Sequence, residues 1–166
     1  MTLAERLTPE LENQLKNTRK ILAAVPNGHN EYKPHEKSML LNRLAGHTAE
    51  LAGFAIFILT LPEINMGTPE DPRKILRMTT REELLAEFEL LAARATEALK
   101  ATSDDVFDET FTLKRQGTVL ASFSRYEAYR NIFLDHMIHH RAQLGVYLRL
   151  LEIPVPATFG PTADEN

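Results

Sequence analysis

Residues 130–152 read RNIFLDHMIHHRAQLGVYLRLLE, and this stretch decides which fold the sequence predicts. Its apolar residues recur at spacings of three and four, which indicates a long amphipathic helix with one buried face. That face comprises Phe133, Met137, Leu144, Leu148 and Leu151. His140 falls within the same stripe, at a position where a core aliphatic residue is expected.

Three of the chain's six histidines lie within five positions of this helix. His136 precedes His140 by four residues, so the two imidazoles lie roughly 40° and one turn apart and can converge on one point. His139 lies about 100° from His140 and is the alternative member of the pair. The sequence therefore predicts a site that begins with His136 and His140.

A second helix, predicted over about residues 35–60, also carries a histidine in its apolar stripe. His47 lies among Leu40, Leu44, Leu51, Phe54 and Ile58. Arg43 and Glu50 flank His47 at one turn, where they are placed to orient it or to line the mouth of a pocket. His47 is therefore the third candidate for the site.

Two more helices complete the prediction. Thr8-Pro9-Glu10 is typical of a helix start and predicts a first helix that ends near residue 24. Thr80 and Glu83 form a capping-box pattern, which predicts a third helix over residues 81–101. The last helix is expected over about residues 124–151.

The connections between these helices are long. Loop 62–79 is expected to contain a short helical turn at 72–76, and the connector 102–123 a short strand at 110–113. We predict one domain over residues 1–166 with an all-α fold, a four-helix bundle with long irregular connecting loops.

Composition restricts the class of function. The chain is 43% hydrophobic and 25% charged with a net charge of −4, which argues against nucleic-acid and anionic-membrane partners. The absence of cysteine excludes disulfides and thiolate metal sites, so a thiol in any reaction has to come from a bound small molecule. The charged N-terminal residues do not match a signal peptide, and the apolar run 51–61 is too short to span a bilayer. We expect a cytoplasmic protein.

Two histidines at i and i+4 on one helix, with a third from a facing helix, are typical of a three-histidine metal site. Such sites keep one coordination position open for water or substrate. The alternative is that each histidine is a hydrogen-bonded core or surface residue. A buried trio without a metal would need several polar partners in an apolar core, which is costly, and we therefore favour the metal.

Other site types fit the sequence less well. The zinc-protease pattern H-E-x-x-H is absent, since Thr48 follows His47 and Met137 follows His136. The E-x-x-H pairs of carboxylate di-iron bundles are absent too. His29 and His35 lie in or beside a loop and are expected to be solvated.

Further polar residues of the last helix divide between two faces. Gln143 and Tyr147 continue the line of His136 and His140, where they either orient a ligand or cap the polar end of the core. Arg141 and Arg149 fall on another face and are expected to be solvated or ion-paired.

Two segments resemble the DinB family, also described as DinB/YfiT-like metalloenzymes. One is DHMIHHRAQLGVYLRLL (135–151) with the following IPVP and FGPTADE; the other is YKPHEKSM (32–39) leading to LAGHTAE (44–50). The resemblance covers nearly the whole chain. It implies a four-helix bundle, a homodimer, and a divalent metal held by His47, His136 and His140. Related members are S-transferases that use bacillithiol or mycothiol, or isomerases, and many have no assigned reaction.

We therefore expect a metal-dependent transferase or hydrolase that acts on a small molecule. Zinc or nickel is the expected metal, with iron as a further option, and a low-molecular-weight thiol is a candidate cofactor. Arg43, Glu50 and Gln143 are candidates for proton handling or orientation. The alternatives are a non-catalytic metal- or ligand-binding bundle and a structural helical dimer with a vestigial site.

Overall fold

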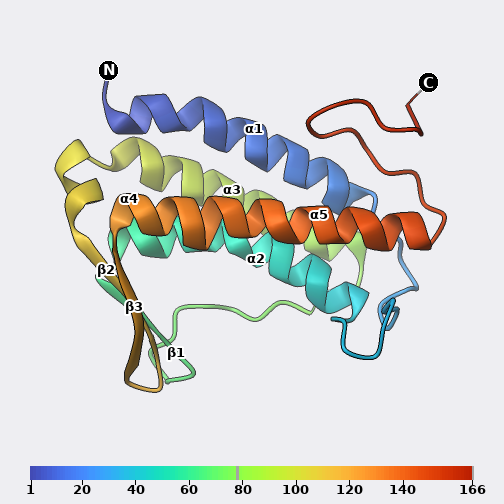
Figure 1. Ribbon diagram of the computed structural model, residues 1–166, viewed down its shortest axis with the longest axis horizontal. Coiled ribbons are helices and arrows are strands. Elements are labelled where there is room, and N and C mark those ends of the chain that lie inside the picture. The colour runs from blue at the N-terminus through green and yellow to red at the C-terminus, as the bar shows by residue number, and fades with distance from the viewer. Residues whose placement is uncertain (78, 166) are drawn as a thin grey trace.

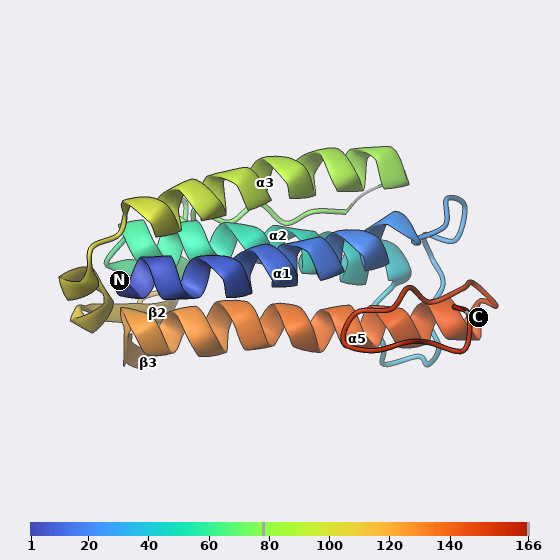
Figure 2. The same cartoon turned by 90° about the horizontal axis from the view of Figure 1, so that it is seen from above.

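Four long helical segments run side by side and form the body of the protein (Figures 1 and 2). The computed structural model describes residues 1–77 and 79–165. Residue 78, in the predicted loop 62–79, and residue 166, at the end of the predicted domain, lie outside the described residues. The four segments are α1 (Leu3–Ala23), α2 (Leu41–Thr60), α3 (Arg81–Ala101) and a composite of α4 (Arg125–Ala128), the π-helical η2 (Tyr129–Leu134) and α5 (Asp135–Leu150).

Helix α1 begins earlier than Thr8-Pro9 predicts. Its N-cap is Thr2, whose hydroxyl accepts from the Glu5 N–H (3.1 Å) while the Glu5 carboxylate accepts from the Thr2 N–H (2.7 Å). Pro9 lies inside the helix, where it has no N–H to donate to the carbonyl four residues earlier. The additional turns bury Leu7, which offsets the cost of the interior proline. The predicted start was wrong.

Helix α2 begins at Leu41 and not near His35. Loop carbonyls satisfy its first N–H groups: Leu41 donates to Tyr32 (2.8 Å) and Asn42 donates to Asn30 (3.1 Å). No side chain caps this end. A tertiary contact therefore sets the start of α2, whereas its end at Thr60 agrees with the prediction.

Helix α3 has the predicted bounds, and the Thr80 hydroxyl accepts from the Glu83 N–H (3.2 Å). The Glu83 carboxylate completes the cap on Thr79, where it accepts from the N–H (3.2 Å) and the hydroxyl (2.7 Å). The prediction of a helical turn at 72–76 was wrong, because these residues contain no helix. These residues form an irregular connection that packs against α2 at Gly46 and buries Leu76.

A small sheet projects from one end of the helices (Figure 1). Its strands, in the order β1-β2-β3, are β1 (Glu63–Met66), β2 (Thr110–Arg115) and β3 (Thr118–Ser124). The strand expected at 110–113 is confirmed within β2, whereas β1 and β3 correct the all-α prediction. The protein is mostly helical with a three-stranded sheet. Strands β2 and β3 form an antiparallel hairpin whose turn residues Gln116 and Gly117 both have positive φ, as a type I′ turn requires.

The fourth helical segment starts at the predicted position. Ser124 and Glu127 form a capping box, and the helix ends at Leu150, close to the expected position. The π-helical segment η2 was not predicted. It lies just before the two histidines of α5, and single π turns of this kind are frequent at functional sites.

The core lies between the helical segments and reaches the sheet. Four residues of the predicted stripe, Phe133, Met137, Leu144 and Leu148, are fully buried, whereas the fifth, Leu151, is half-buried and lies just after the end of α5. Aromatic rings fill the end near the sheet: Tyr129 packs edge-on against Phe133, with ring centroids 5.2 Å apart. Among the helices of the described residues, none is long and apolar enough to cross a membrane.

Candidate metal centre

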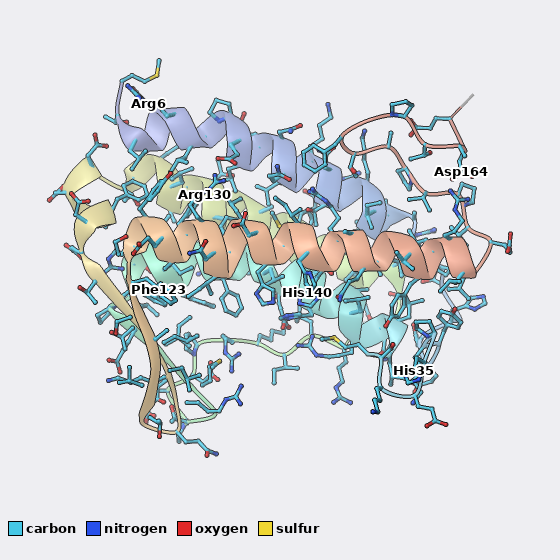
Figure 3. All side chains as sticks on the ribbon, in the orientation of Figure 1. Arg6, His35, Phe123, Arg130, His140 and Asp164 are labelled. Carbon is cyan, nitrogen blue, oxygen red and sulfur yellow. The ribbon has the colours of Figure 1, made fainter. Side chains whose placement is uncertain are left out.

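The three predicted histidines come together between two helices. His47 lies on α2, and His136 and His140 lie one turn apart on α5; each offers a ring nitrogen, and these atoms all lie within 4.8 Å of one another. The ring centroids of His47 and His140 are 4.5 Å apart, and those of His47 and His136 are 5.1 Å apart. Figure 3 shows His140 where α5 passes α2. The convergence that the two apolar stripes predict is present.

Each of the three imidazoles has an oxygen acceptor beside its Nδ1 atom. The Nδ1 of His47 lies 2.5 Å from Glu50 Oε1, that of His140 lies 2.8 Å from Gln143 Oε1, and that of His136 lies 3.3 Å from the Ile132 carbonyl. An acceptor at Nδ1 places the proton of a neutral imidazole there. The Nε2 atom of each ring is then left with a free lone pair, the form that binds a metal.

Two of these Nε2 atoms, on His136 and His140, are 2.9 Å apart. Two lone pairs at this separation repel each other unless a cation or a shared proton lies between them. The pKa of His140 is lowered to about 4. Burial is the largest cause, the neighbouring imidazoles act in the same direction, and the hydrogen bond that His140 donates to Gln143 opposes them. Burial also lowers the pKa of His136, with His47 as the next cause. Protonation of His136 and His140 at neutral pH is thus disfavoured, and the donor set of three imidazoles fits a divalent metal.

Glu50 links His47 to Arg43 and to the backbone of Leu76 through hydrogen bonds. Its Oε1 atom accepts from Arg43 Nη2 (2.7 Å), and its Oε2 atom accepts from the Leu76 N–H (2.9 Å). Burial raises the pKa of Glu50, but the hydrogen bonds from His47 and Arg43 lower it, and the net shift is downward. Glu50 is therefore an ionised carboxylate that orients His47, in line with the role expected for it.

The connection 72–77 lies unusually close to α2 at Gly46. A Cβ atom at this position would lie 2.4 Å from the Leu76 carbonyl oxygen, so only glycine permits the approach. The Leu76 carbonyl also accepts from Arg43 Nη1 (3.3 Å). Sequence reasoning missed Leu76 as a partner of the site; the small residue one position before His47 was the available signal.

A cavity of about 420 Å³ reaches the histidine cluster at His140. Gln143 and Tyr147 form part of its wall, as do residues 37–39 of the loop before α2. The Tyr147 hydroxyl donates to the Met39 carbonyl (2.9 Å) and so holds this loop against α5. Gln143 thus orients His140, while Tyr147 shapes the cavity.

The remaining candidates lie outside the cluster. His139, the alternative ligand, is exposed, and so are His29 and His35. Arg149 is exposed and ion-paired with Asp164, as expected. The expectation for Arg141 was wrong: its side chain is buried and donates to α1, because the C-terminal segment covers this face of α5.

Comparisons with known proteins agree with this architecture. A search of curated proteins returns no match. A DinB-like protein from Bacillus cereus ATCC 10987 shares the fold with a TM-score of 0.70 at 17% identity, over 95% of this chain and 98% of that chain. The DinB-like protein YjoA from Bacillus subtilis shares it with a TM-score of 0.65 at 17% identity, over 97% and 99% of the two chains. The family model for the DinB family matches residues 4–165, and the chain therefore belongs to the DinB family.

Proposed function

We propose that this chain is a metal-dependent enzyme, a transferase or hydrolase of a small molecule, with one divalent metal held by His47, His136 and His140. One observation carries the proposal: three imidazoles from two helices converge, and each has an acceptor at Nδ1 that leaves its Nε2 lone pair free. A bound divalent ion with three protein ligands supplies an acidified water or thiol as nucleophile at neutral pH.

The residues around the histidines have separate tasks in this proposal. Glu50 fixes the ring of His47 and adds one negative charge beside the three imidazoles. Arg43 pairs with Glu50 and keeps that carboxylate ionised and in place. Gln143 holds the ring of His140 from the cavity side. All three act by positioning, and zinc or nickel, with iron as a further option, suits the all-nitrogen donor set.

The cavity beside His140 favours an enzyme over a closed binding module. Its volume of about 420 Å³ lies within the range of small-molecule sites. A substrate in it would contact Gln143 and Tyr147 and lie against the histidine cluster. Because the chain has no cysteine, an external low-molecular-weight thiol is the candidate nucleophile besides water. The homodimer is a further prediction, which analytical ultracentrifugation tests.

The test is the metal content of protein purified without nickel resin or chelator. We expect about one divalent ion per chain, close to none in His47→Ala and His140→Ala because each loses a ligand, and full content in His139→Ala, whose side chain is exposed. Elemental analysis measures all four. Full metal retention in His47→Ala or His140→Ala would contradict the three-histidine assignment.

A second measurement separates the enzyme from the non-catalytic alternative. In cobalt-substituted protein, a small thiol changes the visible absorption spectrum when a coordination position is open to it. A changed spectrum justifies a screen of thiol-dependent transfer reactions. An unchanged spectrum with full metal content favours a binding module.

A further inference from the structure

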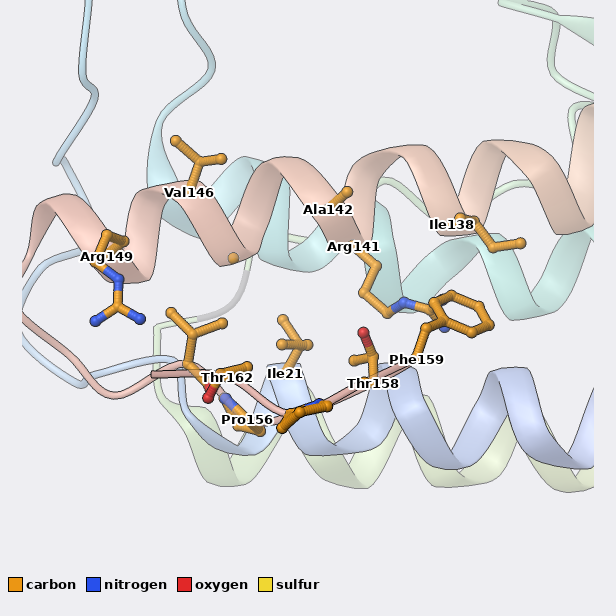
Figure 4. A pocket seen from close by; sticks show the side chains of 14 residues that line it. Ile21, Ile138, Arg141, Ala142, Val146, Arg149, Pro156, Thr158, Phe159 and Thr162 are labelled. Atoms are coloured by element: carbon orange, nitrogen blue, oxygen red, sulfur yellow. The ribbon is translucent and has the colours of Figure 1, made fainter. Parts of the chain in front are cut away.

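A second cavity, of about 520 Å³, lies between α5 and the C-terminal segment (Figure 4), and no histidine lines it. Its walls come from α5, from the end of α1 and from the C-terminal segment 155–162. Successive helical residues are about 100° apart, so Arg141 and Gly145 turn toward this cavity while His136 and His140 turn toward α2. The two sites thus share a helix but use different faces of it.

The C-terminal segment forms an ordered wall of this cavity. Asp164 pairs with Arg149 through two contacts, at 2.5 and 3.0 Å, and also accepts from the Val155 N–H (2.9 Å). The Thr162 hydroxyl donates to the Val155 carbonyl (2.8 Å) and closes the segment on itself. These bonds hold the C-terminal segment in place. Five of the side chains that line the cavity are apolar: Ile21, Ile138, Val155, Pro156 and Phe159.

Of the two arginines that line this cavity, Arg149 is paired with Asp164, whereas Arg141 has no counterion among the described residues. Its residue exposure is 3%, and its Nη1 atom donates to the Gln14 carbonyl (3.1 Å) and to Thr18 Oγ1 (3.2 Å). Its Nη2 atom is buried and has no hydrogen-bond partner among the described residues, and no carboxylate there pairs with it. A buried guanidinium without an anion is costly, which points to a partner from outside the chain.

The position of the guanidinium indicates where that partner would lie. Figure 4 shows Arg141 reaching from α5 toward Phe159, whose ring centroid is 5.2 Å from the Arg141 Cζ atom. Phe159 is 67% exposed, so its ring has few packing contacts to lose when it turns aside. A turn of this ring would uncover the guanidinium group on the side of the cavity.

We propose that this cavity binds a monocarboxylate with an apolar body, whose carboxylate pairs with Arg141 while the body fills the apolar space. Guanidinium groups match carboxylates in geometry and charge, and the cavity volume is in the range of small-molecule sites. The inference is independent of the proposed metal chemistry, since none of the histidines lines this cavity.

The test compares octanoate with octanamide, which has the same body and no charge, by isothermal titration calorimetry on the full chain. We expect saturable octanoate binding and about ten- to a hundredfold weaker octanamide binding, from the loss of a charged hydrogen bond. Arg141→Met should lose the preference for octanoate without a lower unfolding temperature, because it removes an uncompensated buried charge.

Two further variants keep the test decisive. Ala142→Phe places a ring in the cavity from an exposed helix position and should abolish octanoate binding even if Arg141→Met does not fold. His47→Ala should bind octanoate as the unaltered protein does, which separates this site from carboxylate binding at a metal.

Three outcomes would overturn the proposal. Equal affinity for octanoate and octanamide would mean that the Arg141 guanidinium stabilises the fold and does not bind a carboxylate. The buried Oε1 atom of Gln14, which has no other hydrogen-bond partner among the described residues, would then be the acceptor for Arg141 Nη2. Binding lost in His47→Ala and kept in Arg141→Met would place the carboxylate at the histidines. No saturable octanoate binding by the unaltered protein would leave the cavity without this function.

Discussion

At the scale of single residues, Glu50 is the ionised carboxylate that contacts the histidine cluster, through His47. It contacts His47, Arg43 and the Leu76 N–H at once. Glu50→Gln keeps the shape and an acceptor oxygen but removes the charge, so we expect metal affinity to fall about ten- to a hundredfold, as for other partners of ligating histidines. Competition with a chromophoric chelator measures the affinity.

The matched control is Glu87→Gln. Glu87, on α3, pairs with the exposed Lys74 of the connection 72–77 and has no hydrogen bond or ion pair with the histidines, so its substitution should leave metal affinity unchanged. If Glu50→Gln bound metal as tightly as the unaltered protein, the carboxylate would have no part in orienting His47.

At the scale of elements, the packing of connection 72–77 on α2 supports the site from behind. Gly46→Ala places a Cβ atom 2.4 Å from the Leu76 carbonyl oxygen, so the connection has to move away and weaken the Leu76–Glu50 bond. We expect a loss of about 1–3 kcal/mol in the free energy of unfolding, the usual cost of overpacking, together with weaker metal binding. Urea unfolding measures the first effect.

Gly53 on the same helix provides the control. A Cβ atom there has its nearest neighbour, Leu91 Cδ2, at 3.4 Å, which is ordinary contact. Gly53→Ala gains helix propensity of up to about 1 kcal/mol without the clash, so it should unfold at the same or a higher urea concentration. Equal effects of the two substitutions would show that the connection does not depend on Gly46.

At the scale of the whole molecule, the buried histidines make stability depend on pH. The folded pKa of His140 is about 4, below the ordinary value of 6.5, and that of His136 is lowered as well. The unfolded chain therefore binds more protons between these pH values, and protons favour unfolding. The stability of metal-free protein should be complete above pH 6.5 and fall as the pH drops toward 4.

Thermal unfolding of chelator-treated protein across pH 4–8 checks this expectation. His140→Gln should flatten the dependence because it removes the group with the most lowered pKa. His139→Gln changes an exposed side chain and should leave the curve as it is. A pH profile that is the same with and without His140 would contradict the assignment of the effect to this residue.

Much of the helical framework could be predicted because its signals are local. The stripe around Met137 and Leu144, the Thr80 cap and the Ser124 start all depend on neighbours within a few residues along the chain. The capping box that starts α1, at Thr2 and Glu5, was also local, but the more familiar Thr8-Pro9 pattern obscured it.

The sequence by itself determined that His47, His136 and His140 would share the buried side of two helices, because helical periodicity places residues on faces without knowledge of the fold. Only the tertiary structure decided what those faces meet. The parallel pairing of β1 with β2, the Leu76 N–H on Glu50 and the burial of Arg141 under the C-terminal segment each join residues far apart in the chain. Such contacts depend on how elements pack in three dimensions, and no local pattern encodes them.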